Sequence, residues 1–159
     1  MPKKILILRF SSIGDIVLTT PVIRAIKTQL DDVELHYATK KEFAFVLQAN
    51  PYVDKFHFLD GDLKGLGTAL KKEKFDFVVD LHNNLRTRRL KNIINTNSKA
   101  FPKLNWEKWL IVNLKIDKLP NIHIVDRYME AASPLGVKTD VFGSGWNRLC
   151  NATTERHEQ

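Results

Sequence analysis

The amino-acid sequence predicts an α/β protein built on a doubly wound parallel sheet. Short runs rich in β-branched and aromatic residues alternate with helical segments, and the links between them are short, as in βαβ units. The first run, ILIL at residues 5–8, is continuously apolar, as expected of a parallel strand covered on both faces. A chain of 159 residues is long enough to bury the core of one such domain.

The first strand is expected at residues 3–8, and a turn follows at residues 11–14. A helix then starts at Asp15, or restarts at Pro21 with Thr20 as its N-cap. We expect one helix that runs to about Leu30 and is kinked near Pro21. Its apolar face would be formed by Ile16, Thr20, Ile23, Ile26 and Leu30.

The rest of the chain continues the alternation. Further strands are expected at residues 33–38, 55–59, 75–81 and 99–101, and further helices at residues 41–47, 62–73, 84–94, 106–114 and 125–132. The sequence Pro134-Leu135-Gly136 ends the last helix, and the apolar period stops after Thr139. We therefore expect one domain over residues 1–139 and an irregular tail over residues 140–159.

The positive charge of the chain is concentrated in one stretch. Nine basic and two acidic residues lie between positions 84 and 118, an excess that equals the net charge of +7 of the whole chain. Such a surface predicts an anionic partner: a nucleic acid, an anionic membrane surface or a phosphorylated substrate. With one cysteine, no signal-peptide core and no apolar run near the roughly 18 residues of a membrane span, we expect a cytoplasmic protein.

The turn after the first strand is the first candidate site. Ser11, Ser12 and Gly14 offer backbone N–H groups that can hold an anion, and Gly14 allows close approach to the backbone. Asp15 can accept a proton from a substrate hydroxyl within hydrogen-bond reach. The alternative is that Ser12 and Asp15 only cap a helix.

The second candidate site is the segment DLHNNLR at residues 80–86, which leaves the fourth strand at the same edge of the sheet. Arg86, Arg88 and Arg89 can bind phosphate or carboxylate groups there. The alternative is that the arginines form a solvated helix face. His82 is interpreted as a hydrogen-bonded structural histidine rather than a base.

The third candidate is the polar lead into the last helix. There His123 and Asp126 either cap the helix or line the cleft from its other side. No Gly-x-Gly-x-x-Gly motif follows a strand, and no Walker loop or Gly-x-Ser-x-Gly turn is present. The histidines have no metal-ligand spacing in the sequence. We therefore expect no cofactor and no metal.

Three segments carry a resemblance to a known family. The N-terminal ILILRFSSIGDIVLTTPVIRAIK, DLHNNLRTRR after the fourth strand, and HIVDRYMEAASPLGV before residue 138 resemble segments of the lipopolysaccharide heptosyltransferases, glycosyltransferase family nine. The likeness runs from Lys3 to Val137. It implies a Rossmann-like domain, the N-terminal half of a two-domain GT-B enzyme that transfers heptose from ADP-heptose to the lipopolysaccharide inner core, with inversion and without a metal.

The resemblance also implies roles for individual residues. Asp15 matches the proposed general base on the acceptor hydroxyl. The anionic acceptor would be bound by basic and polar groups of this domain, which we expect to be Ser11, Ser12, Gly14, Asn83, Arg86, Arg88, Arg89 and His123. Peripheral contact with the inner face of the cytoplasmic membrane would bring the enzyme to its acceptor.

The expected second, donor-binding domain has no counterpart in residues 140–159. A truncated or frameshifted reading frame, or a protein split over two chains, would explain this, and we expect the chain alone to be catalytically incomplete. One alternative is a non-catalytic module of the same fold that binds an anionic saccharide or lipid head group. Another is a nucleic-acid-binding domain with Phe101, Trp106 and Trp109 as stacking surfaces, although no nucleic-acid signature accompanies them.

Overall fold

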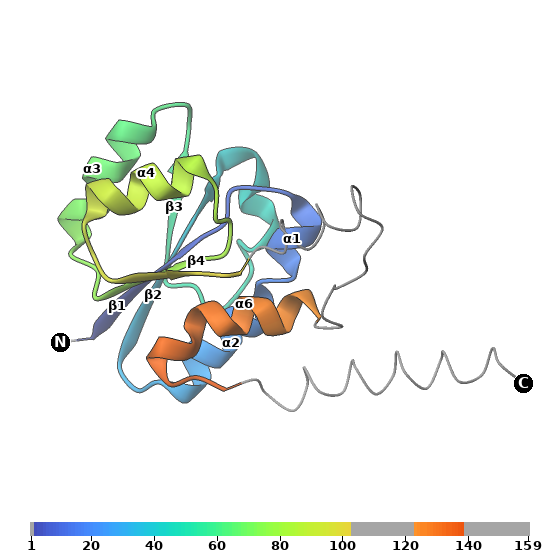
Figure 1. Cartoon of the computed structure of the whole chain (residues 1–159). Coiled ribbons are helices and arrows are strands. Elements are labelled where there is room, and N and C mark those ends of the chain that lie inside the picture. Colours follow the sequence, from blue (N-terminus) through green and yellow to red (C-terminus); the bar gives the residue numbers. More distant parts are fainter. Residues whose placement is uncertain (1, 103–122, 139–159) are drawn as a thin grey trace, which may run out of the picture.

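The computed structural model describes residues 2–102 and 123–138. Its centre is a five-stranded parallel sheet in the order β3-β2-β1-β4-β5 (Figure 1). The strands are β1 (Lys3–Leu8), β2 (Val33–Lys40), β3 (Lys55–Leu59), β4 (Phe77–Asp80) and β5 (Ser98–Ala100). This confirms the predicted Rossmann-like, doubly wound fold, although β4 is shorter than the expected 75–81.

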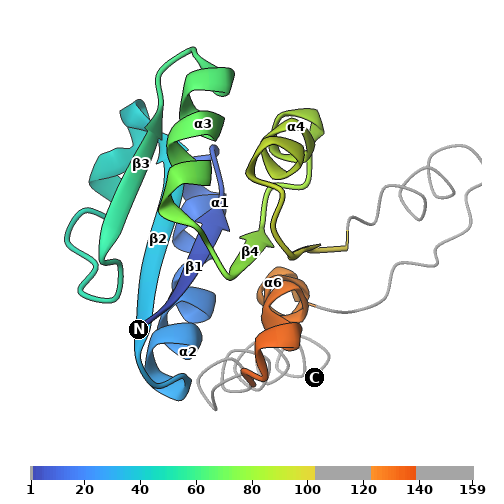
Figure 2. The ribbon, with the colours of Figure 1, turned by 90° about the vertical axis from the view of Figure 1, so that its left-hand side faces the viewer.

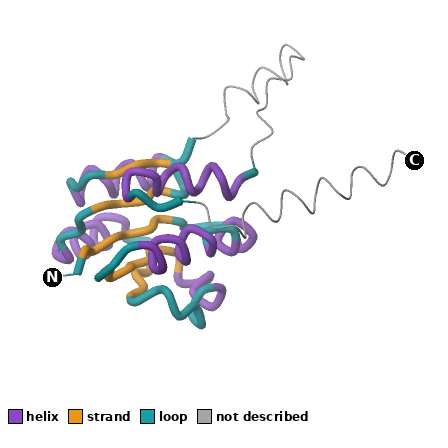
Figure 3. Tube along the Cα trace, turned by 90° about the horizontal axis from the view of Figure 1, so that it is seen from below, coloured by secondary structure: helices purple, strands orange, loops and turns teal. Residues whose placement is uncertain are grey.

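Helices cover both faces of the sheet. They are α1 (Ile13–Val17), α2 (Thr20–Gln29), α3 (Leu63–Glu73), α4 (Leu85–Ile94) and α6 (Ile124–Ala132), with 3₁₀ turns η1 (Lys41–Val46) and η2 (Ser133–Leu135). Helices α3 and α4 lie on one face, and α2 and α6 on the other (Figures 1 and 2). The strands form one layer between them (Figure 3). The helix expected at 106–114 and the tail at 140–159 lie outside the described residues.

Strand β1 is buried on both faces, as its apolar sequence predicts. Ile5 and Ile7 pack into the cluster that includes α2 and α6, whereas Leu6 and Leu8 pack into the cluster under α3 and α4. All four side chains are at most 1% exposed. Burial of one such side chain is worth about 1.5–3 kcal/mol. Because alternate residues of β1 point to opposite faces, the strand stabilises both halves of the core.

The single kinked helix expected up to Leu30 is wrong, because α1 ends at Val17 and α2 begins at Thr20. Pro21 has no N–H to donate to the carbonyl of Val17, so the helical ladder stops there. The hydroxyls of Thr19 and Thr20 instead donate to the carbonyls of Ile16 (2.6 Å) and Val17 (2.7 Å). The segment 41–47 likewise forms a 3₁₀ turn rather than an α-helix.

The strand order fixes where a ligand can approach. From β1 the chain winds outward through β2 to β3, then returns to the other side of β1 to form β4 and β5. The winding therefore reverses between β1 and β4, and open α/β sheets bind ligands outside the carboxyl ends of the strands at such a point. Across residues 2–102 and 123–138, no helix is long and apolar enough to cross a membrane.

Candidate functional site

The loops that leave β1 and β4 meet at this reversal point. The N–H of Leu81 donates to the carbonyl of Leu8 (3.1 Å), so the two strands stay paired to their ends. Phe10 and His82 then touch edge to face, with ring centroids 5.8 Å apart. The structure thus places the first two predicted segments side by side.

Asp15 lies in the first turn of α1, shortly after β1, and three donor groups contact its carboxylate. Its Oδ2 atom accepts hydrogen bonds from the Ser12 N–H (3.1 Å) and the Ser12 hydroxyl (2.8 Å), and forms an ion pair with Arg9 (2.6 Å). The Asp15 side chain remains 37% exposed. The carboxylate is therefore fixed in orientation but still open to a substrate.

The pKa of Asp15 is lowered from its ordinary value. Partial burial alone would raise this pKa, but the hydrogen bonds from Ser12 and the positive charge of Arg9 together outweigh that effect. Asp15 is therefore a carboxylate at neutral pH, the form that can accept a proton or pair with a cation.

Arg9 is a part of the site that the sequence analysis missed. Its side chain is 9% exposed, its guanidinium donates to the carbonyl of Leu81, and it lies over the ring of Tyr128 at 5.6 Å. It therefore links the β1 loop, the β4 loop and helix α6. A basic residue directly after a buried strand is the signal that points to such a role.

Tyr128 is the second missed residue, and it comes from α6. Its ring is buried beneath Arg9 and packs edge to face on Phe101, at 5.0 Å. Burial raises the pKa of the Tyr128 hydroxyl, and the charge of Asp15 raises it further against the opposing effect of Arg9. The hydroxyl therefore stays protonated and can donate a hydrogen bond.

Gly14 lies in α1 with open space beside it. A Cβ added at Gly14 would meet no atom within 4 Å, and the residue is exposed. Within residues 2–102 and 123–138, no contact requires glycine here, so close approach by a ligand is one reason for it. Ser11, partly buried, completes the turn between Arg9 and α1.

The loop after β4 is built around a buried carboxylate. Asp80 is fully buried and accepts from the N–H groups of His82 (3.1 Å) and Asn83 (2.7 Å), and Lys91 of α4 pairs with it at 2.8 Å. The Asn83 side chain donates to the carbonyl of Phe101 (2.9 Å). Asn83 therefore has a structural contact, and its predicted role in acceptor binding stays a prediction.

The predicted basic helix is α4, with Asn84 as its N-cap. The N–H of Thr87 donates to the Asn84 side chain at 2.9 Å. Arg86, Arg88 and Arg89 are exposed, and none of them forms an ion pair within the described residues. Their charges face solvent near the Asp15 edge of the sheet. Lys103, Lys108, Lys115 and Lys118 of the same basic stretch lie outside the described residues.

His123 is the N-cap of α6, which confirms the capping alternative from the sequence. Its Nδ1 atom accepts from the N–H of Val125 at 3.3 Å, and the residue is exposed. The structure gives no contact between His123 and the Asp15 loop, so the capping contact leaves its predicted acceptor-binding role a prediction.

Two curated proteins match most of the chain. Lipopolysaccharide heptosyltransferase 1 of Campylobacter coli is 27% identical, over 87% of this chain and 46% of that protein. The lipopolysaccharide core heptosyltransferase OpsX of Haemophilus influenzae is 28% identical, over 86% of this chain and 41% of that protein. The chain is related to the lipopolysaccharide heptosyltransferases. No family model matches it.

Solved structures agree on the fold of this heptosyltransferase relative. A glycosyl transferase family 9 protein from Veillonella parvula matches with a TM-score of 0.66 and 21% identity, over 86% of this chain and 42% of that one. The E. coli heptosyltransferase WaaC with ADP matches with a TM-score of 0.66 and 18% identity, over 86% and 49%. The chain therefore spans less than half the length of these relatives.

Proposed function

We propose that this heptosyltransferase relative forms the acceptor side of a glycosyltransferase, with Asp15 as the general base. The observation that supports this most is the Asp15 carboxylate, oriented by Arg9 and Ser12, ionised, and partly exposed at the reversal point of the sheet. A general base must lie within hydrogen-bond reach of the hydroxyl whose proton it accepts, and it must itself be unprotonated.

The proposed step is a displacement at the anomeric carbon of the donor sugar. An acceptor hydroxyl oxygen forms a bond to the anomeric carbon of the donor sugar, while the bond from that carbon to the nucleotide phosphate breaks and the phosphate leaves with the electron pair. The hydroxyl proton passes to Asp15. The lowered pKa makes Asp15 a weak base, but the hydroxyl becomes strongly acidic as its new bond forms, so transfer late in the step suffices.

Arg9 and Tyr128 would position this base rather than react. The Arg9 guanidinium fixes one carboxylate oxygen and keeps Asp15 ionised between turnovers, so the proton is then released to water. Tyr128 supports the Arg9 guanidinium from below. No metal is needed for this step.

The acceptor is proposed to be the anionic inner core of lipopolysaccharide. The exposed arginines of α4 are available to phosphate and carboxylate groups, because no acidic partner within the described residues holds them. The turn residues Ser11, Ser12 and Gly14 would contact the sugar nearest to Asp15, and Asn83 and His123 would border the site. Peripheral contact with an anionic membrane surface is part of this proposal.

The donor is proposed to be ADP-heptose, held by protein beyond what these 159 residues supply. The relatives are about twice as long as the matched region, and the family resemblance assigns donor binding to a second domain. We therefore expect acceptor binding by this chain alone, and turnover only when a donor-binding half is added.

A chimaera tests this proposal. This chain is fused to the unmatched C-terminal half of the Campylobacter coli relative and incubated with ADP-heptose and a lipid A–Kdo acceptor. We expect transfer by the chimaera and none by the unfused chain. Turnover by the chain alone would contradict the need for a second half, and a folded chimaera that binds ADP-heptose but not the acceptor would contradict the acceptor-side role.

One observation favours a second candidate, a non-catalytic module that binds an anionic saccharide. The Arg9–Asp15 ion pair joins three elements, so Asp15 has a structural reason to be present without any chemistry. In that case the chain binds lipopolysaccharide core fragments, and the chimaera binds both substrates without turnover.

A further inference from the structure

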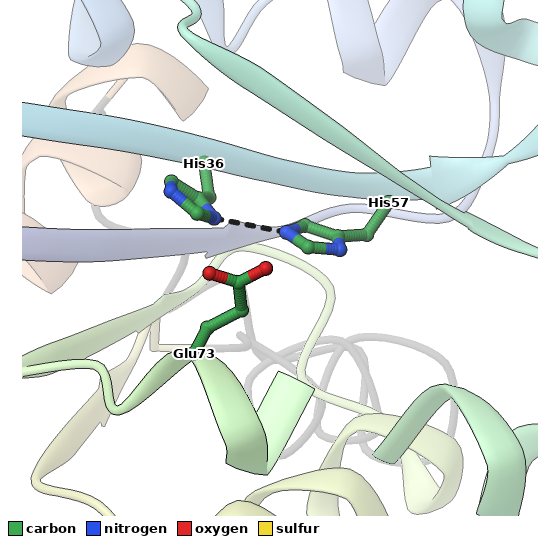
Figure 4. Close-up of side chains that lie close together, drawn as sticks. All are labelled: His36, His57 and Glu73. Atoms are coloured by element: carbon green, nitrogen blue, oxygen red, sulfur yellow. Dashed lines mark hydrogen bonds between the residues drawn. The ribbon is translucent and has the colours of Figure 1, made fainter. Parts of the chain in front are cut away.

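A second cluster of side chains lies away from Asp15, on the α3 face of the sheet. His36 comes from the middle of β2, His57 from the middle of β3, and Glu73 from the last residue of α3 (Figure 4). One ligand atom from each lies within 4.8 Å of the other two. The strand register explains the approach, because His57 pairs with Ala38, two positions beyond His36 on the same face.

The ring of His36 is oriented by a carboxylate. His36 is fully buried, and its Nε2 lies 2.7 Å from Glu34 Oε1. A carboxylate can only accept, so Nε2 is the donor in this contact. The other ring nitrogen of His36, Nδ1, faces His57 Nε2 at 2.9 Å. A histidine whose second nitrogen donates to a carboxylate is the arrangement that orients metal ligands in proteins.

The rings of His57 and His36 share one aromatic neighbour. Phe75 packs edge to face with both imidazoles, with ring centroids 5.0 Å from His36 and 6.2 Å from His57. The two rings are thus held together on an apolar support.

Glu73 supplies the carboxylate and is now paired with lysines. Lys4 lies 3.4 Å from Glu73 and 3.7 Å from Glu34, and Lys55 also pairs with Glu73. The Lys4 and Lys55 side chains are 30% and 50% exposed, so both can turn into water. They compete with a cation for Glu73, and removal of one lysine should strengthen cation binding.

We propose that His36, His57 and Glu73 form a site for a divalent transition metal, and that zinc fits it best. Two imidazoles and one carboxylate suit Zn²⁺, with water as a fourth ligand, whereas Mg²⁺ and Ca²⁺ prefer oxygen ligands only. The ion would join edge strand β3, β2 and the C-terminus of α3 at the amino end of the sheet. This site is independent of the proposed transfer step.

Metal binding would replace the hydrogen bond between His36 Nδ1 and His57 Nε2, because both nitrogens would then be ligands. The proton in that hydrogen bond would pass to solvent water or to another ring nitrogen. Glu73 exchanges its lysine contacts for the metal, and Glu34 keeps its hydrogen bond to His36.

The test uses the full chain, freed of metal with a chelator, and Zn²⁺ alone as the probe. We expect one zinc per chain in a competition titration against a chromophoric chelator. We also expect the thermal midpoint to rise by roughly 5–10 °C when zinc exceeds its Kd about a hundredfold. Cobalt in the same site should show no thiolate charge-transfer band, because none of the three proposed ligands is a cysteine.

Variants separate this site from unspecific binding. His57→Gln and Glu73→Gln should each weaken zinc binding by at least about 100-fold, and Lys55→Met should strengthen it. His82→Gln and Cys150→Ser should bind zinc as the wild type does; His82 lies at the opposite end of the sheet. The proposal is overturned by the absence of saturable zinc binding, or by unchanged affinity in folded His57→Gln.

Discussion

Replacement of Asp15 by asparagine removes one charge and almost no volume, so it probes the carboxylate directly. The wild-type Oδ2 atom accepts two hydrogen bonds from Ser12 and pairs with Arg9. The substituted amide side chain still offers one oxygen to these donors but no negative charge. Arg9, with a side chain that is 9% exposed, then loses its counter-charge in a largely buried position.

The expected cost follows from these contacts. Hydrogen bonds to a charged group are worth about 1 kcal/mol more than neutral ones. The Asp15 side chain is 37% exposed, so solvent screening reduces this gain for the Ser12 bonds more than for Arg9. We expect Asp15→Asn to lower the free energy of unfolding by about 1–2 kcal/mol at pH 7.

The pH dependence has a definite sign. The pKa of Asp15 in the folded protein lies below its ordinary value of 3.8. The stability that the Asp15 charge contributes is therefore fully present at pH values above the pKa of the unfolded state. It is lost as pH falls through the folded pKa. The difference between wild type and Asp15→Asn in urea unfolding should therefore be constant from pH 7 to about pH 5 and shrink below about pH 4.

Asp54→Asn is the matched control. Asp54 is also 37% exposed and pairs with Lys27 at 2.6 Å, and its pKa is lowered because the Lys27 and Leu35 hydrogen bonds outweigh burial. It should lose stability over the same pH range without any effect on sugar transfer. Unchanged stability of Asp15→Asn at pH 7, or a loss of stability that persists undiminished in acid, would contradict a stabilising Arg9–Asp15 ion pair.

Two further changes test the surroundings of Asp15. Gly14→Ala should fold and gain up to about 1 kcal/mol, because alanine is the better helix residue and no atom of the described residues obstructs its Cβ. Acceptor affinity should nevertheless fall in a binding titration, and unchanged affinity would argue against close approach of a ligand at Gly14. Lys91→Met should lower the free energy of unfolding by about 3 kcal/mol, because it leaves the fully buried Asp80 without its cation. The matched change at the exposed Lys71, Lys71→Met, should lower it by under about 0.5 kcal/mol. Equal losses in denaturant unfolding would show that Asp80 needs no partner.

The fold was predictable because local sequence and tertiary structure agree. The apolar run at residues 5–8 is typical of a strand covered on both faces, and the helical segments between successive strands favour parallel crossovers. The break before Pro21 was harder to predict. A proline one turn into a helix either kinks it or starts a new one, and here the Thr19 and Thr20 hydroxyls satisfy the freed carbonyls, so two helices form.

The candidate site was predictable only in part. Asp15 stands out because it follows a strand and a glycine turn. Arg9 and Tyr128 do not, because their contact joins positions more than a hundred residues apart. The His36–His57–Glu73 cluster depends on the register between β2 and β3 and on the length of α3, neither of which histidine spacing in the sequence reveals.

The most direct test of Asp15 as the general base is sugar transfer by the chimaera that carries Asp15→Asn, compared with Asp54→Asn in the same chimaera. With ADP-heptose and a lipid A–Kdo acceptor, we predict that Asp15→Asn lowers kcat by about 10²–10⁴-fold and leaves the acceptor Kd within a few-fold, while Asp54→Asn keeps full turnover. A folded Asp15→Asn chimaera with turnover within about tenfold of the wild type would contradict the assignment of Asp15 as the base.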